Sequence, residues 1–292
     1  MTSMILEALS GLGIFLFGML YMELALKEAA GIRFKNWIKN STSTPFKSIL
    51  TGAGATAALQ SSSVVTLMTL SFVSAALISL ESGIAVIFGS NLGTTATAWI
   101  VATLGFKVKI EVFALPMIAI GGFILALGSS HKSMMAMVKA FIGFGLLFFG
   151  LDVMKTAIES AASSIDLAEY AQLPLMAFVG LGFVLTALIQ SSSAVTAIVL
   201  SALYAQILSF DQSASMVIGT NIGTTVTALM GAIGGIPDKK RAAFAHLFFN
   251  VLTAFAAFVL LPFLQMPLPK TLGLESDPIT ALPIIHPPRI SV

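Results

Sequence analysis

Long apolar runs dominate the chain, and short polar or charged stretches separate them. A helix needs about 20 residues to cross the hydrocarbon core of a bilayer. Runs close to this length cover residues 5–30, 83–104, 110–128, 213–234 and 242–264, and a further run surrounds Gly143 and Gly150. Each predicts a membrane-crossing helix, although Gly89, Gly93 and a polar cluster interrupt the run at 83–104.

Two further runs, 46–59 and 64–80, are too short to span the bilayer, and residues 175–204 repeat their pattern. Each pair predicts a re-entrant hairpin, in which one helix enters the membrane and the next returns. The turns fall on polar residues, at 60–63 in the first hairpin and at 190–193 in the second. Non-helical backbone is tolerated at membrane depth only where protein buries it or where it lines a cavity.

The polar motifs repeat at a fixed offset. Gln60-Ser61-Ser62-Ser63 returns 130 residues later as Gln190-Ser191-Ser192-Ser193. The pattern Gly-x-Asn-x-Gly-Thr-Thr occurs at 89–95 and returns at 219–225. Three glycines of the first run recur at an offset of 132, since Gly11, Gly13 and Gly18 match Gly143, Gly145 and Gly150. These offsets predict two transmembrane repeats, 1–133 and 134–265, followed by a short tail at 266–292.

Counting crossings gives the relative orientation of the repeats. A re-entrant hairpin returns to the side from which it entered, so each repeat crosses the membrane three times. Because three is odd, the second repeat begins on the opposite side and must sit upside down relative to the first. The loops agree, because 31–47, 129–139 and 236–241 are basic whereas 159–173 is acidic. The predicted fold is therefore an all-α polytopic membrane protein with two inverted-topology repeats, each of three membrane crossings plus one re-entrant hairpin. The positive-inside rule places the amino terminus outside.

The basic stretch 31–47 carries Arg33, Lys35, Lys39 and Lys47, with Trp37 among them. Two interpretations stay open: a segment lying in the membrane interface, or a solvated basic loop. Both place the stretch inside the cell.

Composition supports a membrane setting and excludes several function classes. Hydrophobic residues make up 57% of the chain and charged residues only 10%, against about 25% charged in soluble domains. The net charge of +2 does not indicate nucleic-acid binding. The absence of cysteine excludes disulfides, zinc-thiolate sites and thiol catalysis. Because no catalytic triad, metal cluster or nucleotide-binding loop is present, we do not expect an enzyme.

The repeated motifs are dense in hydroxyl and amide groups that are costly to bury without partners. Two such motifs in inverted repeats predict one ligand site near the midplane, at the repeat interface. Hydroxyls and free carbonyls suit an alkali cation, and hydroxyls with N–H groups at helix N-termini can donate to an oxyanion. No Lys or Arg lies in these segments, so a bound dianion would need co-bound cations. The alternative is that these small residues only let helices pack.

These residues carry a resemblance to the type II sodium-phosphate cotransporter family, whose hallmark is a pair of Gln-Ser-Ser-Ser motifs in inverted repeats. The resemblance covers roughly residues 8–265 and includes the companion Gly-x-Asn-x-Gly-Thr-Thr motif. It implies that phosphate is bound by Ser61, Ser62, Ser63, Ser191, Ser192, Ser193, Asn91 and Asn221. It implies that sodium is held by Gln60, Gln190, Thr66, Thr196, Ser63, Ser193, Thr94, Thr95, Thr224 and Thr225. Sodium is then the coupling ion, and no transition metal or organic cofactor is expected.

The predicted function is sodium-coupled symport of inorganic phosphate across a bacterial inner membrane. The expected partners are phosphate, sodium and the lipid bilayer, and a homo-oligomer is left open. Three alternatives remain: transport of another divalent oxyanion or a dicarboxylate, export of phosphate, and a non-transporting sensor or scaffold that only binds phosphate. Sequence fixes the sites but not the direction of flux.

Three further features are singled out. His246 to Asn250 resembles a His-x-x-Phe-Asn element of bacterial family members, and His246 is interpreted as either a packing residue or a proton relay. Asp152 lies in an apolar run and is either functional or at the outer interface. In the tail, an apolar stretch from Ile279 predicts a further helix, which Pro283 and the prolines at 287 and 288 cut short.

Overall fold

The computed structural model describes residues 2–107, 111–128, 132–162 and 173–264, and within them every regular element is an α-helix. The predicted tail at 266–292 and most of the acidic loop lie outside the described residues. The helices are α1 (Thr2–Asn40), α2 (Pro45–Leu59), α3 (Ser62–Ser74), α4 (Leu80–Lys107), α5 (Glu111–Leu127), α6 (Lys132–Ala162), α8 (Leu175–Ile189), α9 (Ser192–Tyr204), α10 (Phe210–Gly223), α11 (Thr225–Ala232) and α12 (Pro237–Leu264).

Four of these helices are long and apolar enough to cross a membrane: α1, α4, α6 and α12. The prediction of an all-α polytopic membrane protein agrees with this finding. The remaining two predicted crossings correspond to shorter helices, since α5 has 17 residues and the run at 213–234 is divided between α10 and α11.

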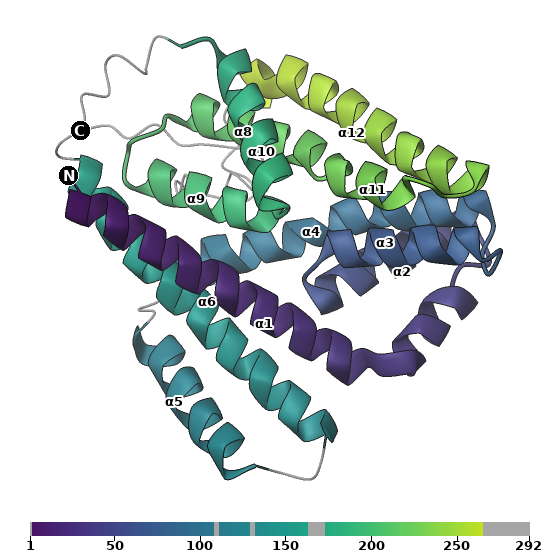
Figure 1. The fold of residues 1–292 in the computed structure, drawn as a ribbon. Helices are drawn as coiled ribbons and strands as arrows, with labels where there is room; N and C mark the ends of the chain where they lie inside the picture. The colour runs from purple at the N-terminus through teal and green to yellow at the C-terminus, as the bar shows by residue number, and fades with distance from the viewer. Residues whose placement is uncertain (1, 108–110, 129–131, 163–172, 265–292) are drawn as a thin grey trace, which may run out of the picture.

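Helices α1 and α6 lie side by side (Figure 1) and run antiparallel along a seam of glycines. A Cβ atom added at Gly11 would lie 3.0 Å from the carbonyl oxygen of Gly150, and one added at Gly18 would lie 2.8 Å from that of Gly143. Any side chain at these positions would therefore push the two backbones apart. The seam borders the largest buried apolar cluster, which includes Phe15 of α1.

Two helical hairpins, α2–α3 and α8–α9, occupy the places where re-entrant hairpins are predicted. In both, a 15-residue helix is followed by a 13-residue helix, and neither is long enough to span a bilayer. Hairpin α2–α3 packs on α4, and hairpin α8–α9 packs on α10. Gly52 and Gly182 sit against the backbones of Val86 and Met216, so both hairpins approach their helix at equivalent positions.

The polar cluster at 89–95 does not break α4, which continues from Leu80 to Lys107. Its hydroxyl groups bond back to carbonyl oxygens of the same helix: Ser90 Oγ to Ile87 at 2.8 Å, and Thr95 Oγ1 to Leu92 at 2.7 Å. A hydroxyl satisfied in this way can stay in a helix at membrane depth. The interruption lies in the apolar pattern rather than in the backbone.

Helix α1 continues through the first part of the basic stretch and ends at Asn40. Ile38 is fully buried, in a cluster with Ala55, Leu59 and Val65 of the first hairpin, while Lys35 and Lys39 are exposed. This one-sided packing keeps 31–40 helical and favours a helix lying against the protein over a solvated loop.

Helix α12 packs along α11 and α10 and also reaches α4 and α3 (Figure 1). Near its start, Ala242 and Ala243 are buried with Leu70 of α3 and Ile87 of α4. Further along, Ala254 packs on Val179 and Ile218. The final crossing therefore touches elements of both predicted repeats.

Candidate functional site

The two serine turns have the same backbone geometry. Gln60 and Gln190 end their helices in the left-handed region, at φ 56° and φ 61°. The next residue, Ser61 or Ser191, is extended and caps the following helix, and its Oγ accepts the N–H of Val64 at 3.4 Å or of Ala194 at 3.2 Å. One helix therefore stops and the next begins within two residues.

The glutamine side chains hold these turns in place. A positive φ is uncommon for a residue with a side chain, and here a matching set of hydrogen bonds stabilises it. Gln60 Nε2 donates to the carbonyl oxygen of Ala57, and Gln60 Oε1 accepts from Thr97 Oγ1 at 2.8 Å. In the second copy, Gln190 Oε1 accepts from Thr227 Oγ1 at 2.7 Å. The first turn is thus tied to α4 and the second to α11, which begins at the last threonine of the second motif.

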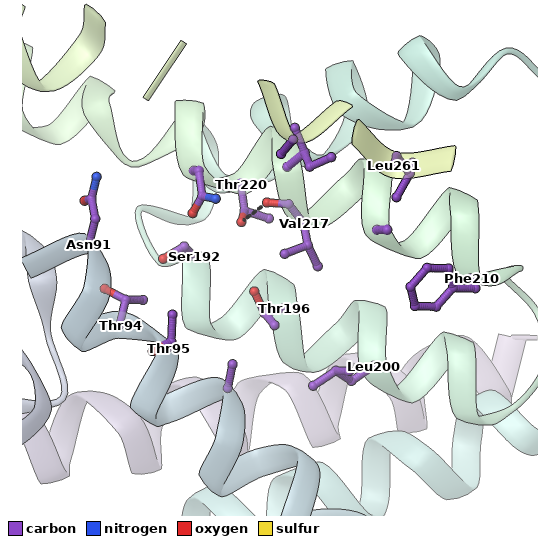
Figure 2. Close-up of a pocket in the computed structure, with 15 residues that line it drawn as sticks. Asn91, Thr94, Thr95, Ser192, Thr196, Leu200, Phe210, Val217, Thr220 and Leu261 are labelled. Atoms are coloured by element: carbon purple, nitrogen blue, oxygen red, sulfur yellow. Dashed lines mark hydrogen bonds between the residues drawn. The ribbon is translucent and has the colours of Figure 1, made fainter. Parts of the chain in front are cut away.

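A cavity of about 230 Å³ lies between α4, α9, α10 and α12 (Figure 2). Pockets for drug-sized ligands measure about 300–1,000 Å³, so this cavity is smaller than that range and has room for a small solute. Asn91, Thr94 and Thr95 reach it from α4, and Ser192 and Thr196 reach it from α9. The other lining residues are Ala98, Leu200, Phe210, Ala214, Val217, Ile218, Thr220, Asn221, Ala257 and Leu261.

The cavity joins the Asn-Gly-Thr-Thr segment of the first copy to the serine turn of the second. Of the predicted phosphate ligands, it brings together Asn91, Ser192 and Asn221. Of the predicted sodium ligands, it brings together Thr94, Thr95 and Thr196. The other predicted residues do not line it: Gln60, Ser61, Ser62, Ser63, Thr66, Gln190, Ser191, Ser193, Thr224 and Thr225.

Several of those other residues have protein partners instead. Thr66 Oγ1 lies 3.5 Å from Ser90 Oγ, and both side chains are buried. Thr225 Oγ1 donates to the carbonyl oxygen of Ile222 at 2.7 Å. Ser61, Ser62 and Ser63 lie partly exposed at the start of α3. Their assignments as ligands stay predictions.

The cavity wall combines a cluster of polar side chains with a larger apolar part, and it carries no charge among the described residues. Its polar side chains are asparagine, serine and threonine, and no ionisable residue is found among the described lining residues. Ser192 is the first residue of α9, so the positive end of a 13-residue helix opens at the cavity. Free N–H groups at a helix N-terminus are suited to an anion. Without a lysine or arginine there, a dianion would need another source of positive charge.

Three residues of this region, Thr220, His246 and Asn250, are not among the predicted ligands, although the sequence pattern from His246 to Asn250 stood out. Thr220 lines the cavity and donates to the carbonyl oxygen of Val217 at 2.7 Å. His246 Nε2 and Asn250 Oδ1 lie 3.2 Å and 3.1 Å from the amide atoms of Asn91. The spacing of His246 and Asn250 puts both on one helix face, but nothing local indicates their common partner. Asp152 lies half-buried on α6 and does not line the cavity.

Comparison with known proteins gives matches along most of the chain. YqeW of Bacillus subtilis is 31% identical over 280 residues, 95% of this chain and 86% of that protein. The "Putative inorganic phosphate export protein YjbB" of Escherichia coli is 26% identical over 96% of this chain and 50% of that protein, so the chain spans about half its length. Human "Sodium-dependent phosphate transport protein 2C" is 37% identical over 101 residues, which is 33% of this chain and 16% of that protein.

No solved structure matches the chain. The family model described as Na+/Pi-cotransporter matches residues 14–156 and 161–268, a span that includes both serine turns and every residue of the cavity wall. The chain therefore belongs to the Na+/Pi-cotransporter family.

Proposed function

We propose that this protein is a secondary transporter that binds inorganic phosphate together with sodium in the cavity between α4, α9 and α10. One observation carries the proposal: the cavity joins both motif copies, opens at the N-terminus of α9, and gathers Asn, Ser and Thr side chains without a charged side chain among the described residues. Such a wall offers donors to an oxyanion but no countercharge. Co-bound sodium supplies that charge and couples the two ions.

The family supports this function. It is a family of transporters rather than of enzymes, and relatives carry names that state sodium-dependent phosphate transport or phosphate export. In the proposed site, Ser192 and the first N–H groups of α9 donate to phosphate oxygens, and Asn91 and Asn221 add amide donors. The hydroxyls of Thr94, Thr95 and Thr196 act as sodium ligands, because sodium prefers hard oxygen atoms.

The proposal keeps the two inverted repeats, 1–133 and 134–265, in the cell membrane with the amino terminus outside. Helices α1 and α6 hold equivalent places in the two repeats and run antiparallel, as inverted repeats require. The two serine turns share backbone angles and glutamine bonds at a constant offset, which supports an equivalent role for Ser61–Ser63 in the transport cycle.

Transport of labelled phosphate into proteoliposomes tests the function. An inward sodium gradient should drive accumulation of phosphate above its equilibrium level, and replacing sodium by choline should abolish it. By linkage, phosphate should raise the affinity for sodium by the same factor as sodium raises that for phosphate. Equal phosphate binding in sodium and in choline would contradict the coupling.

Export is the second candidate, because the match to the protein of Escherichia coli that is named "Putative inorganic phosphate export protein YjbB" covers 96% of this chain. Vesicles loaded with phosphate and diluted into sodium-free and sodium-containing buffers separate the two directions. Loss of internal phosphate that needs no sodium gradient would favour export. Sulfate and succinate, added as competitors, test the alternative anions in the same assay.

A further inference from the structure

Helix α12 holds the amide of Asn91 with two side chains that lie one helical turn apart. His246 and Asn250 are 3% and 2% exposed, so both are removed from solvent. Asn91 Nδ2 donates to Asn250 Oδ1 at 3.1 Å, and Asn91 Oδ1 lies 3.2 Å from His246 Nε2. Asn91 is also a wall residue of the cavity, on its α4 side (Figure 2).

The direction of each bond follows from one backbone carbonyl group. Asn250 Nδ2 lies 2.8 Å from the carbonyl oxygen of His246, which can only accept. The nitrogen of Asn250 therefore faces its own helix and its oxygen faces Asn91. Asn91 must then present its nitrogen to Asn250 and its oxygen to His246.

An amide oxygen can only accept, so His246 must carry a proton on Nε2. Its other ring nitrogen, Nδ1, is buried and has no hydrogen-bond partner among the described residues. A proton on Nδ1 would leave a buried donor unpaired, which is costly. The arrangement therefore selects the neutral ring with its proton on Nε2, and that ring acts as a fixed donor.

A stacked aromatic pair reinforces the contact between α12 and α4. The ring centroids of Phe88 and Phe249 lie 4.1 Å apart. Phe88 is one turn before Asn91 on α4, and Phe249 directly precedes Asn250 on α12. The ring stack sets the distance between the helices, and the polar pair sets the amide orientation.

The second copy has no such support. Asn221 also lines the cavity, but its side chain is exposed and forms no hydrogen bond within the part of the chain that the structure describes. The residues 130 positions before His246 and Asn250 are Pro116 and Ile120, which cannot provide these side-chain bonds. Asn91 and Asn221 occupy equivalent positions in the repeated motif, but only Asn91 is held by other side chains in the part of the chain that the structure describes.

We propose that His246 and Asn250 are positioning residues that fix the amide of Asn91, so that the cavity meets one N–H and one oxygen lone pair in a set orientation. Asn221 is then the adaptable partner of the pair. This inference rests on the proposed function, because it takes the cavity as the substrate site. Removal of the support should weaken phosphate recognition through Asn91 alone.

A double-mutant cycle in the proteoliposome assay tests the link. His246→Leu should raise the KM for phosphate about tenfold, as expected for loss of a buried hydrogen bond, with little change in kcat. In an Asn91→Ala background the same substitution should add nothing, because its effect passes through Asn91. In an Asn221→Ala background it should keep its full effect. His246→Gln retains a donor near the Nε2 position and should restore most of the affinity.

The inference would be overturned if His246→Leu raised the KM for phosphate by the same factor in the wild-type and in the Asn91→Ala background. A wild-type KM in His246→Leu would also overturn it. Wild-type protein without phosphate transport would instead overturn the proposed function. An activity-independent measurement covers that case and any loss of folding in His246→Leu. The chain has three histidines, so His131→Gln and His286→Gln leave His246 as the single ¹⁵N-histidine signal.

In this background the nitrogen shifts should show a neutral ring protonated on Nε2, and Asn91→Ala should move both shifts. Thr253→Val, on the same helix and with its hydroxyl bonded to its own backbone, serves as the control that should leave them unchanged. A proton on Nδ1 alone, or shifts indifferent to Asn91→Ala, would overturn the inference whatever the transport assay shows.

Discussion

At the scale of single residues, the two serine turns are matched in their bonds and differ in their surroundings. Gln60 with Thr97 and Gln190 with Thr227 form the same hydrogen bond at 2.8 Å and 2.7 Å. The first pair is part-buried, with Thr97 5% exposed, and the second pair is exposed at the surface of the protein. A buried hydrogen bond is more costly to lose because the group left behind cannot bond to water.

This difference gives a prediction for a matched pair of substitutions. Thr97→Val should lower the free energy of unfolding by about 1–2 kcal/mol, because it leaves Gln60 Oε1 without its donor. Thr227→Val should cost less, about 0.5 kcal/mol, because Gln190 Oε1 is exposed and is not sealed inside the protein when its donor is lost. Thermal unfolding in detergent measures both, with Thr97→Ser as the control that keeps the hydroxyl. Equal losses in the two valine variants would contradict the prediction.

The serines give a second residue-level prediction. Ser192 lines the cavity whereas Ser62, its counterpart, does not. Ser192→Ala should weaken phosphate binding by about 1–3 kcal/mol, since a donor to the anion is lost. Ser62→Ala is the matched variant and should weaken binding less in the state described here. Isothermal titration calorimetry in sodium compares them, and a larger loss in Ser62→Ala would show that the first turn is the principal anion site.

Residue identities in the motifs could be predicted from their repetition, but their partners could not. Ser192 and Asn91 both stood out from the sequence, and the structure brings them to one cavity. The support of Asn91 by His246 spans 155 residues. No local periodicity or cap signal encodes a contact of that range, because it depends on how α12 crosses α4.

At the scale of helices, run length and turn chemistry were sufficient to predict both hairpins. Residues 46–59 were too short to span a bilayer and ended at a polar turn, and α2 ends at Leu59. Run length and turn chemistry could not predict that α4 continues unbroken through its motif whereas the second copy of the motif is divided between α10 and α11. The same motif occupies both places, and only packing of the surrounding helices distinguishes them.

Glycines on α1 offer a test of element packing. Gly18→Ala should lower the free energy of unfolding by about 1–3 kcal/mol, because its Cβ would lie 2.8 Å from the carbonyl oxygen of Gly143 and force the helices apart. Gly13→Ala, on the same helix with nothing within 4 Å of the added Cβ, should be neutral or stabilise by up to about 1 kcal/mol. Thermal unfolding decides, and a neutral Gly18→Ala would mean that the seam is looser than described.

At the scale of the whole molecule, the arrangement is less symmetric than the sequence repeats suggest. Helix α5 packs along α6, whereas α12, its counterpart, crosses α10, α11 and α4 (Figure 1). The two predicted repeats therefore share their hairpins and first helices but place their last helices differently. Counting crossings could not reveal this, because such a count assigns each helix an orientation but no neighbour.

Topology is the prediction that belongs to this scale. The native chain has no cysteine, so single cysteines report their side directly. A cysteine at Asn40, at the end of α1, should react with an impermeant maleimide only after the membrane is opened. A cysteine at Leu173, which is exposed just before α8, should react in intact spheroplasts. Labelling of both from one side would contradict the inverted orientation of the repeats.

The glycine seam has a consequence for how such a chain can be built. The contact of Gly11 with Gly150 is matched by that of Gly18 with Gly143, and exchanging the two helices exchanges one contact for the other. This is the property of an isologous interface, in which each partner contributes the same surface. Each first helix therefore carries the glycine pattern that a twofold contact of this kind requires. The same glycine contacts would be present between two separate copies of a half-length chain, so the covalent link between the halves is not what creates them.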